Sequence, residues 1–183
     1  MPDRLHFTDS DDANELIASE PIALLIGFAL DQQVTVQKAF MGPLVIRERL
    51  GTLDPAALAS ADLEPLFRER PAVHRYPGSM ARRVRELAEY ICDTYDGDAA
   101  RVWKDAADGA QLRANLEALP GFGEMKVKSL GAVLAKHFGV AAAQELVPPH
   151  PTLGDVDSAQ ALADYQAKKK IHKAEWSRVR AAS

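Results

Sequence analysis

Apolar residues recur along this chain every three to four positions, which is the spacing of one face of an α-helix. The pattern is clearest after Ser79, where Val84, Leu87, Ala88 and Ile91 fall on one side of a predicted helix. No segment longer than a few residues alternates apolar and polar positions as a strand would. The sequence therefore predicts an all-α fold.

Capping residues, prolines and glycines mark where the predicted helices start and stop. Asp54-Pro55, for example, is typical of an N-cap followed by a first-turn proline, and Gly51 ends the preceding helix. The proline-rich stretch 147–151 is expected to be irregular. The helices that we expect span about 10–17, 22–30, 34–50, 55–61, 62–68, 98–107, 110–118 and 158–180, together with one that Ser79 caps.

The segment 119–123, with the sequence Leu-Pro-Gly-Phe-Gly, separates two helical patterns, which stop at Leu119 and resume near Val127. Gly121 and Gly123 permit backbone angles closed to other residues and let a second backbone approach closely. The free N–H groups that open the second helix favour an anion, because the helix dipole is positive there. The segment therefore predicts a binding site for a DNA phosphate. The alternative is a plain helix–helix connection.

The charge of the chain is small but unevenly distributed. A net charge of −4 on 183 residues argues against binding nucleic acid through bulk charge alone. Every charged residue from Asp9 to Glu20 is acidic, whereas the charged residues of 168–180 are all Lys or Arg except Glu175. This polarity can place one face on a phosphate backbone, and a solvated C-terminal helix explains the lysines equally well.

Cys92 is the only cysteine, which excludes an intrachain disulfide, a cysteine-based zinc site and a four-cysteine iron–sulfur cluster. Its apolar neighbours predict a buried structural thiol. The N-terminus lacks the basic-then-apolar layout of a signal peptide, and the apolar run 21–30 is too short to span a bilayer. We therefore expect a soluble, cytoplasmic protein that does not act at a membrane.

Two segments outside the hairpin carry candidate DNA contacts. Gln32 and Gln33 lie at a helix junction, where long neutral side chains can read base edges or fill the gap left by an extruded base. The first turns of the next strongly patterned helix carry Arg82, Arg83 and Arg85, and arginines and free N–H groups can hold a phosphate there. The alternatives are surface amides and intrahelical pairs with Glu86 or Glu89.

A third segment carries candidate catalytic carboxylates. Asp155 and Asp157 lie just ahead of the last predicted helix. A carboxylate kept ionised beside a scissile glycosidic bond can activate water or stabilise a developing oxocarbenium ion. Plain helix capping is the alternative.

In order along the chain, Gln32-Gln33, Met80-Ala81-Arg82, the hairpin 119–123 and Val156-Asp157-Ser158 resemble the helix-hairpin-helix (HhH-GPD) DNA glycosylase superfamily. This superfamily includes endonuclease III, the adenine glycosylase and the alkylbase glycosylases. The resemblance implies a two-lobed helical fold: one lobe of 21–139, with the helix-hairpin-helix at about 110–138, and a second of 1–20 plus 140–183. Double-stranded DNA would lie in the cleft, with the target base flipped into a pocket.

The resemblance also implies roles for individual residues. The hairpin would hold phosphates near the lesion, and Gln33 would take the place of the intercalating glutamine. Asp157 would be the catalytic carboxylate, with Asp155 in reserve. The residues expected to contact DNA are Gln32, Gln33, Arg82, Leu119, Gly121, Phe122, Gly123, Lys126 and Lys128.

The chain departs from the superfamily pattern in three ways. Met125 occupies the position of the lysine nucleophile of the bifunctional members, and Lys126 and Lys128 lie on other faces of the helix, since one residue is a rotation of about 100°. Asp157 lies further past the hairpin than the superfamily's aspartate, by the length of the proline-rich stretch. The cluster-binding cysteines are absent, so DNA contacts near the C-terminus would come from 168–173.

We therefore expect a monofunctional DNA glycosylase that hydrolyses the N-glycosidic bond of a damaged or mismatched base. Because the cluster-binding cysteines are absent, we expect no iron–sulfur cluster; we expect no other metal or cofactor either, apart from the option of a monovalent cation at the hairpin. The alternatives are a catalytically inactive helix-hairpin-helix protein that recognises damaged or distorted DNA and a helical protein–protein adaptor. Phe28, Asp31, Phe122 and His150 are candidate pocket or wedge positions, with a helix cap the preferred role for Asp31.

Overall fold

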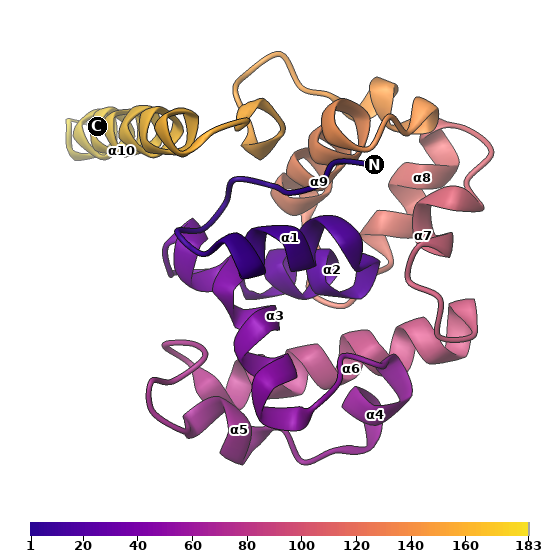
Figure 1. Ribbon diagram of the computed structural model, residues 1–183. Coiled ribbons are helices and arrows are strands. Elements are labelled where there is room, and N and C mark those ends of the chain that lie inside the picture. The colour runs from indigo at the N-terminus through magenta and orange to yellow at the C-terminus, as the bar shows by residue number, and fades with distance from the viewer. Residues whose placement is uncertain (183) are drawn as a thin grey trace.

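The computed structural model describes residues 1–182, and this part of the chain contains helices and no strand, which confirms the all-α prediction (Figure 1). The α-helices are α1 (Asp11–Ser19), α2 (Pro21–Leu30), α3 (Val36–Leu50), α4 (Pro55–Ser60), α5 (Glu64–Arg68), α6 (Pro77–Tyr95), α7 (Arg101–Lys104), α8 (Gly109–Glu117), α9 (Glu124–His137) and α10 (Ala159–Ala181). Two 3-10 helices, η1 (Ala141–Leu146) and η2 (Leu153–Asp155), lie between α9 and α10.

Half of the α-helices begin at a side-chain cap. An oxygen of the capping side chain accepts a hydrogen bond from a backbone N–H group in the first turn of α1, α3, α4, α8 and α10. The capping residues are Ser10, Thr35, Asp54, Asp108 and Ser158. Short polar residues at these positions therefore set where the helices start.

Two predicted boundaries are wrong. α6 begins at Pro77, so Ser79 lies inside the helix, because the fixed φ of proline suits a first turn. Of the predicted helix 98–107 only α7 is helical. The Asp98 carboxylate accepts a hydrogen bond from the Ala100 N–H group at 3.0 Å, which holds the preceding chain in a turn.

The helices pack in two groups that share one continuous core. α1, α2 and α3 pack on one another and α4 and α5 cover α6, whereas α8 and α9 pack on η1, and η2 lies on α9. α2 is central, because every residue after Pro21 is buried. Phe40 of α3 contacts Phe7 and Phe28 edge-on, at ring-centroid distances of 4.9 and 5.1 Å. The two-lobed architecture and its boundaries at 20 and 139 stay predictions.

α10 extends away from the rest of the molecule (yellow in Figure 1). Only its first turns pack on the body, where Leu162 is buried and Tyr165 is half-buried. The side-chain amides of Gln166 and of Gln37 in α3 exchange two hydrogen bonds, at 2.7 and 3.1 Å. From Ala167 to the last described residue, every residue is exposed. The second half of α10 is therefore clear of the body.

Within residues 1–182 no single helix is long and apolar enough to cross a bilayer; α1 and α2 meet that test only as a pair, with a bend of 114° between them.

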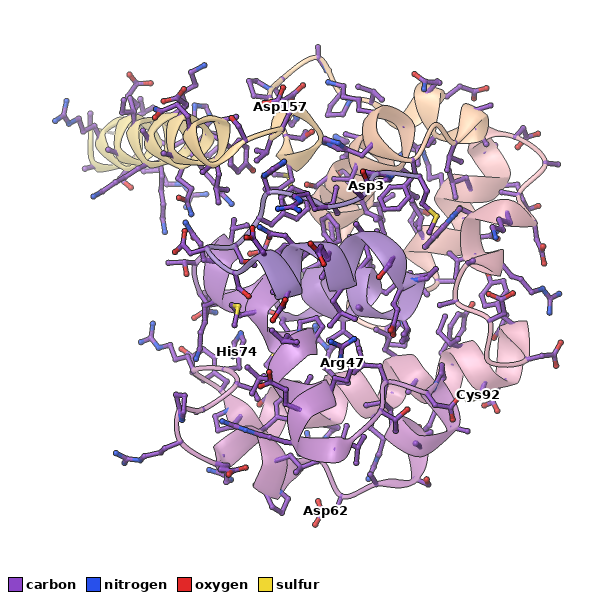
Figure 2. The ribbon with its side chains drawn as sticks, viewed as in Figure 1. Asp3, Arg47, Asp62, His74, Cys92 and Asp157 are labelled. Carbon is purple, nitrogen blue, oxygen red and sulfur yellow. The ribbon has the colours of Figure 1, made fainter. Side chains whose placement is uncertain are left out.

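Cys92 is half-buried on α6 (Figure 2), not fully buried as expected. Partial burial raises the pKa of its thiol, and the nearby carboxylates of Asp54 and Asp93 add to this effect.

Candidate functional site

The hairpin joins α8 to α9 in a tight, exposed turn. The Phe122 N–H group donates a hydrogen bond to the Leu119 carbonyl at 3.1 Å, and both side chains are buried beneath the turn. Gly121 has φ +78°, a left-handed angle that favours glycine. Gly123 is the N-cap of α9 with an ordinary φ of −85°, and no side chain of the described chain caps this helix. Both glycines are exposed, so the turn presents backbone to solvent.

Arg83, rather than the expected Arg82, lies against the hairpin. A Cβ atom added to Gly121 would lie 2.6 Å from Arg83 Cδ and would overlap its guanidinium group. Arg82 is exposed and lines a separate shallow depression of about 100 Å³ with Asp62 and other residues of α5 and α6. Arg83 is therefore the α6 arginine that accompanies the hairpin.

Gln32 and Gln33 are exposed in the turn between α2 and α3. Gln33 has φ +57°, in the left-handed region that a side chain disfavours, and its Oε1 atom accepts a hydrogen bond from the Tyr76 hydroxyl at 3.1 Å. Buried His74 supports this turn: its Nδ1 accepts from the Tyr76 N–H group at 2.9 Å and its Nε2 lies 3.0 Å from the Leu30 carbonyl oxygen. Burial lowers the pKa of His74.

A cavity of about 670 Å³ opens next to the start of α9, within the size range of small-ligand sites. Its walls come from the end of α2, the first half of α9, the loop before η2 and the exposed part of α10. The lining residues are Phe28, Asp31, Met125, Lys126, Lys128, Ser129, His150, Pro151, Thr152, Tyr165, Lys168, Lys169 and His172. Of the candidate pocket positions, Phe28, Asp31 and His150 line the cavity. Phe122 is buried and is not among the lining residues.

Asp31 is the carboxylate in this lining. Its backbone N–H group caps α2 by donating to the Phe28 carbonyl at 3.2 Å, so the expected cap is made by the main chain. No group within residues 1–182 donates a hydrogen bond to the Asp31 carboxylate or pairs with it as an ion pair. Burial raises its pKa, while the charges of Lys169 and Lys126 act in the opposite direction.

Lys126 links the hairpin to α2 inside the cavity. Its Nζ atom donates to the Ala29 carbonyl at 3.1 Å and lies 5.8 Å from the centroid of the Phe122 ring. Burial, followed by the charge of Arg83, lowers the pKa of Lys126 to about 8, while Asp31 opposes this shift. Lys126 therefore loses its proton more readily than an ordinary lysine.

Met125, Lys126 and Lys128 point in different directions from α9, but this does not keep any of them out of the cavity. All three side chains line it, because the cavity extends around the first turns of α9 rather than facing a single side. Lys128 also forms an ion pair with Glu124 at 2.8 Å, one turn earlier on the same helix. Its charge is thus partly neutralised.

Asp155 and Asp157 do not line the cavity. Asp155 lies against the last turn of α9, and Asp157, labelled in Figure 2, lies between η2 and α10. Asp155 accepts a hydrogen bond from the Thr152 N–H group at 2.8 Å and pairs with Lys136 in the last turn of α9. Burial raises the pKa of Asp155, but the bonds from Lys136 and Thr152 outweigh it, so the pKa is lowered. Asp157 is exposed, its charge acts on His137, and Ser158 rather than Asp157 caps α10.

Comparison of the chain with protein-family models, with curated proteins and with solved structures finds no match. The resemblance to the helix-hairpin-helix glycosylases, and the residue roles that follow from it, stay predictions. Within residues 1–182 no group of three or more His, Cys, Asp or Glu side chains is arranged to hold a metal ion.

Proposed function

We propose that this protein is a monofunctional DNA glycosylase that takes an everted base into the cavity beside the hairpin. The observation that supports this best is the Asp31 carboxylate, which lines the cavity and has no partner among the described residues. A partly buried carboxylate that the protein leaves unbonded is costly unless a ligand uses it. Such a group is typical of a binding or catalytic site.

The surroundings of the cavity support DNA as the ligand. The exposed glycine turn and the uncapped start of α9 offer backbone N–H groups to a phosphate. The rim of the cavity on α10 carries Lys168 and Lys169. Arg83 adds a cation beside Gly121. A strand whose phosphate sat on the hairpin would have an adjacent nucleotide within reach of the cavity mouth, because the same helix, α9, forms both.

The chemistry that we assign to Asp31 is activation of water. Its carboxylate accepts a proton while the water oxygen bonds to C1′ of the everted nucleotide. The C1′–N bond breaks, its electron pair leaves with the base, and the base takes up a proton from solvent. The product is an abasic sugar. Lys126 and Lys169 favour the ionised carboxylate that this step needs.

The proposal differs from the sequence-based assignment in its choice of acid. Asp155 is bonded to Lys136 and Thr152, so it is not available to a reacting water without breaking both contacts. Asp157 lies near His137, and α9 is about 20 Å long from the hairpin to that end. An everted nucleotide in the cavity is nearer to Asp31 than to either residue.

The test is base release from duplexes that carry a panel of damaged and mismatched bases. We expect the wild-type protein to release a base from at least one duplex, and Asp31→Asn to lower the single-turnover rate about 10²–10⁴-fold, the usual loss when a general base is removed. Asp157→Asn is the matched control and should keep the wild-type rate. Full activity of Asp31→Asn together with loss in Asp157→Asn would return the catalytic role to Asp157.

One observation favours a second function, a DNA-binding protein without catalysis. Asp155 and Asp157, the two carboxylates that the resemblance assigns to catalysis, lie outside the cavity. Such a protein would bind abasic or distorted DNA and never break the glycosidic bond. Binding and base release measured on the same lesion separate the two functions: tight binding with no release from any duplex would establish the second.

A further inference from the structure

α10 carries one face that begins in the cavity and continues beyond the body of the protein. Residues at a spacing of three, four, seven or eight lie on the same side of a helix. Tyr165, Lys169 and His172 follow this spacing and line the cavity. The same spacing continues through Lys173, Trp176 and Arg180, all of which are exposed. We call these six residues the α10 stripe.

The α10 stripe places a cation beside an aromatic ring in both its cavity half and its outer half. The Arg180 guanidinium lies 5.4 Å from the centroid of the Trp176 ring, and Lys169 Nζ lies 5.8 Å from that of Tyr165. Trp176 is 57% exposed, which is unusual for the largest apolar side chain. Cations beside exposed rings are typical of surfaces that follow a nucleic-acid backbone and contact its bases or sugars.

We propose that the α10 stripe binds the phosphate backbone of duplex DNA that flanks the everted nucleotide. The proposal rests on the proposed function, because it takes the cavity as the place of the target base. Lys173 and Arg180 then contact successive phosphates outside the cavity, and Trp176 packs against the strand between them. Charge complementarity supports this partner: the acidic residues of α10, Asp164 and Glu175, lie off the stripe.

An anionic membrane surface fits α10 less well. A helix that lies in a bilayer interface gathers its apolar residues on one side. Ile171 and Trp176 are five positions apart, which is a rotation of about 140°, so their side chains leave the helix in different directions. The cationic stripe, in contrast, is continuous with the cavity.

The test compares two double variants that remove equal charge from the same exposed helix. Lys173→Gln with Arg180→Gln alters the α10 stripe, and Lys170→Gln with Arg178→Gln is the control on the other side. Binding of a lesion-containing duplex is measured from 50 to 300 mM salt. The stripe variant should flatten the slope of log K against log salt by about 1.8, since each lost phosphate contact removes about 0.9. The control should change it by less than about half that amount.

Three outcomes would overturn the α10 proposal. Equal changes in both variants would show a diffuse charge effect, and no change in either would show a solvated helix. Loss of binding to phosphatidylserine vesicles with unchanged DNA binding would assign the stripe to a membrane. The control variant should release base at the wild-type rate, since Lys170 and Arg178 are exposed and lie off the α10 stripe. Failure of the proposed function would be distinct, because the wild-type protein itself would then release no base.

Discussion

The two hairpin glycines allow a sharp test, because they lie two residues apart in one exposed turn and differ in backbone conformation. In Gly121→Ala the new Cβ is forced into φ +78°, which costs about 1–2 kcal/mol for an L-residue. It also meets the Arg83 side chain, but the overlapping atoms are at the flexible end of a long chain and can move away. Alanine also lowers the conformational entropy of the unfolded chain, which stabilises the folded state by about 0.4–1 kcal/mol. We expect a net loss of about 1 kcal/mol, or a Tm lowered by about 2–4 °C.

Gly123→Ala is the matched control. Its φ of −85° is ordinary, and no atom lies within 4 Å of a Cβ built there. The smaller preference of alanine for an N-cap, about 0.5 kcal/mol, opposes a similar gain from the unfolded chain. Stability should therefore stay within about 0.5 kcal/mol of wild type. Urea denaturation of the three proteins measures both differences.

The same two variants, Gly121→Ala and Gly123→Ala, test whether the hairpin binds a DNA phosphate. Either added methyl group stands where a DNA backbone would approach, so both variants should bind lesion duplexes more weakly, although only Gly121→Ala is less stable. Equal stability of the two variants would refute the account of the left-handed turn. Unchanged DNA affinity in both would refute the proposed contact with phosphate.

The remaining predictions concern charge and chemistry at the site. Because burial places the pKa of His74 below its ordinary value of 6.5, the unfolded chain binds a proton first, and the free energy of unfolding should fall as the pH drops below 6.5. Urea titrations from pH 8 to 5 check this, and a His74→Gln variant that kept the full slope would contradict it. Borohydride reduction should trap no covalent DNA adduct; an adduct lost in Lys126→Met would show a Schiff base at the cavity amine instead.

The all-α fold and most helix starts could be predicted from the sequence because they depend on local signals, the apolar period and the capping residues. The sequence also contained the information that separates Arg83 from Arg82 as the arginine next to the hairpin. Arg83 is one turn before Leu87 and so borders the apolar face of α6, whereas Arg82 is displaced by about 100°. The position of a residue relative to the buried face, rather than its place in a motif, was the signal that would have found it.

The cavity could not be predicted in this way. Asp31 and Tyr165 line the same cavity although more than a hundred residues separate them along the chain. Local capping rules therefore favoured a cap for Asp31. Its backbone N–H group does cap α2, whereas its carboxylate lines the cavity. The left-handed φ of Gln33 has no local sequence signal either. Gln33 accepts a hydrogen bond from the hydroxyl of Tyr76, the residue that precedes α6.

Base release by the wild-type protein and by Asp31→Asn, each on the same panel of lesion duplexes, tests the central claim most directly. The account predicts release of a base by the wild-type protein, a rate about 10²–10⁴-fold lower in Asp31→Asn, and nearly equal DNA affinity for the two. The variant should also be slightly more stable, because it removes a carboxylate whose ionised form is disfavoured by burial. Release at the wild-type rate by Asp31→Asn, or no release by either protein, would contradict the account.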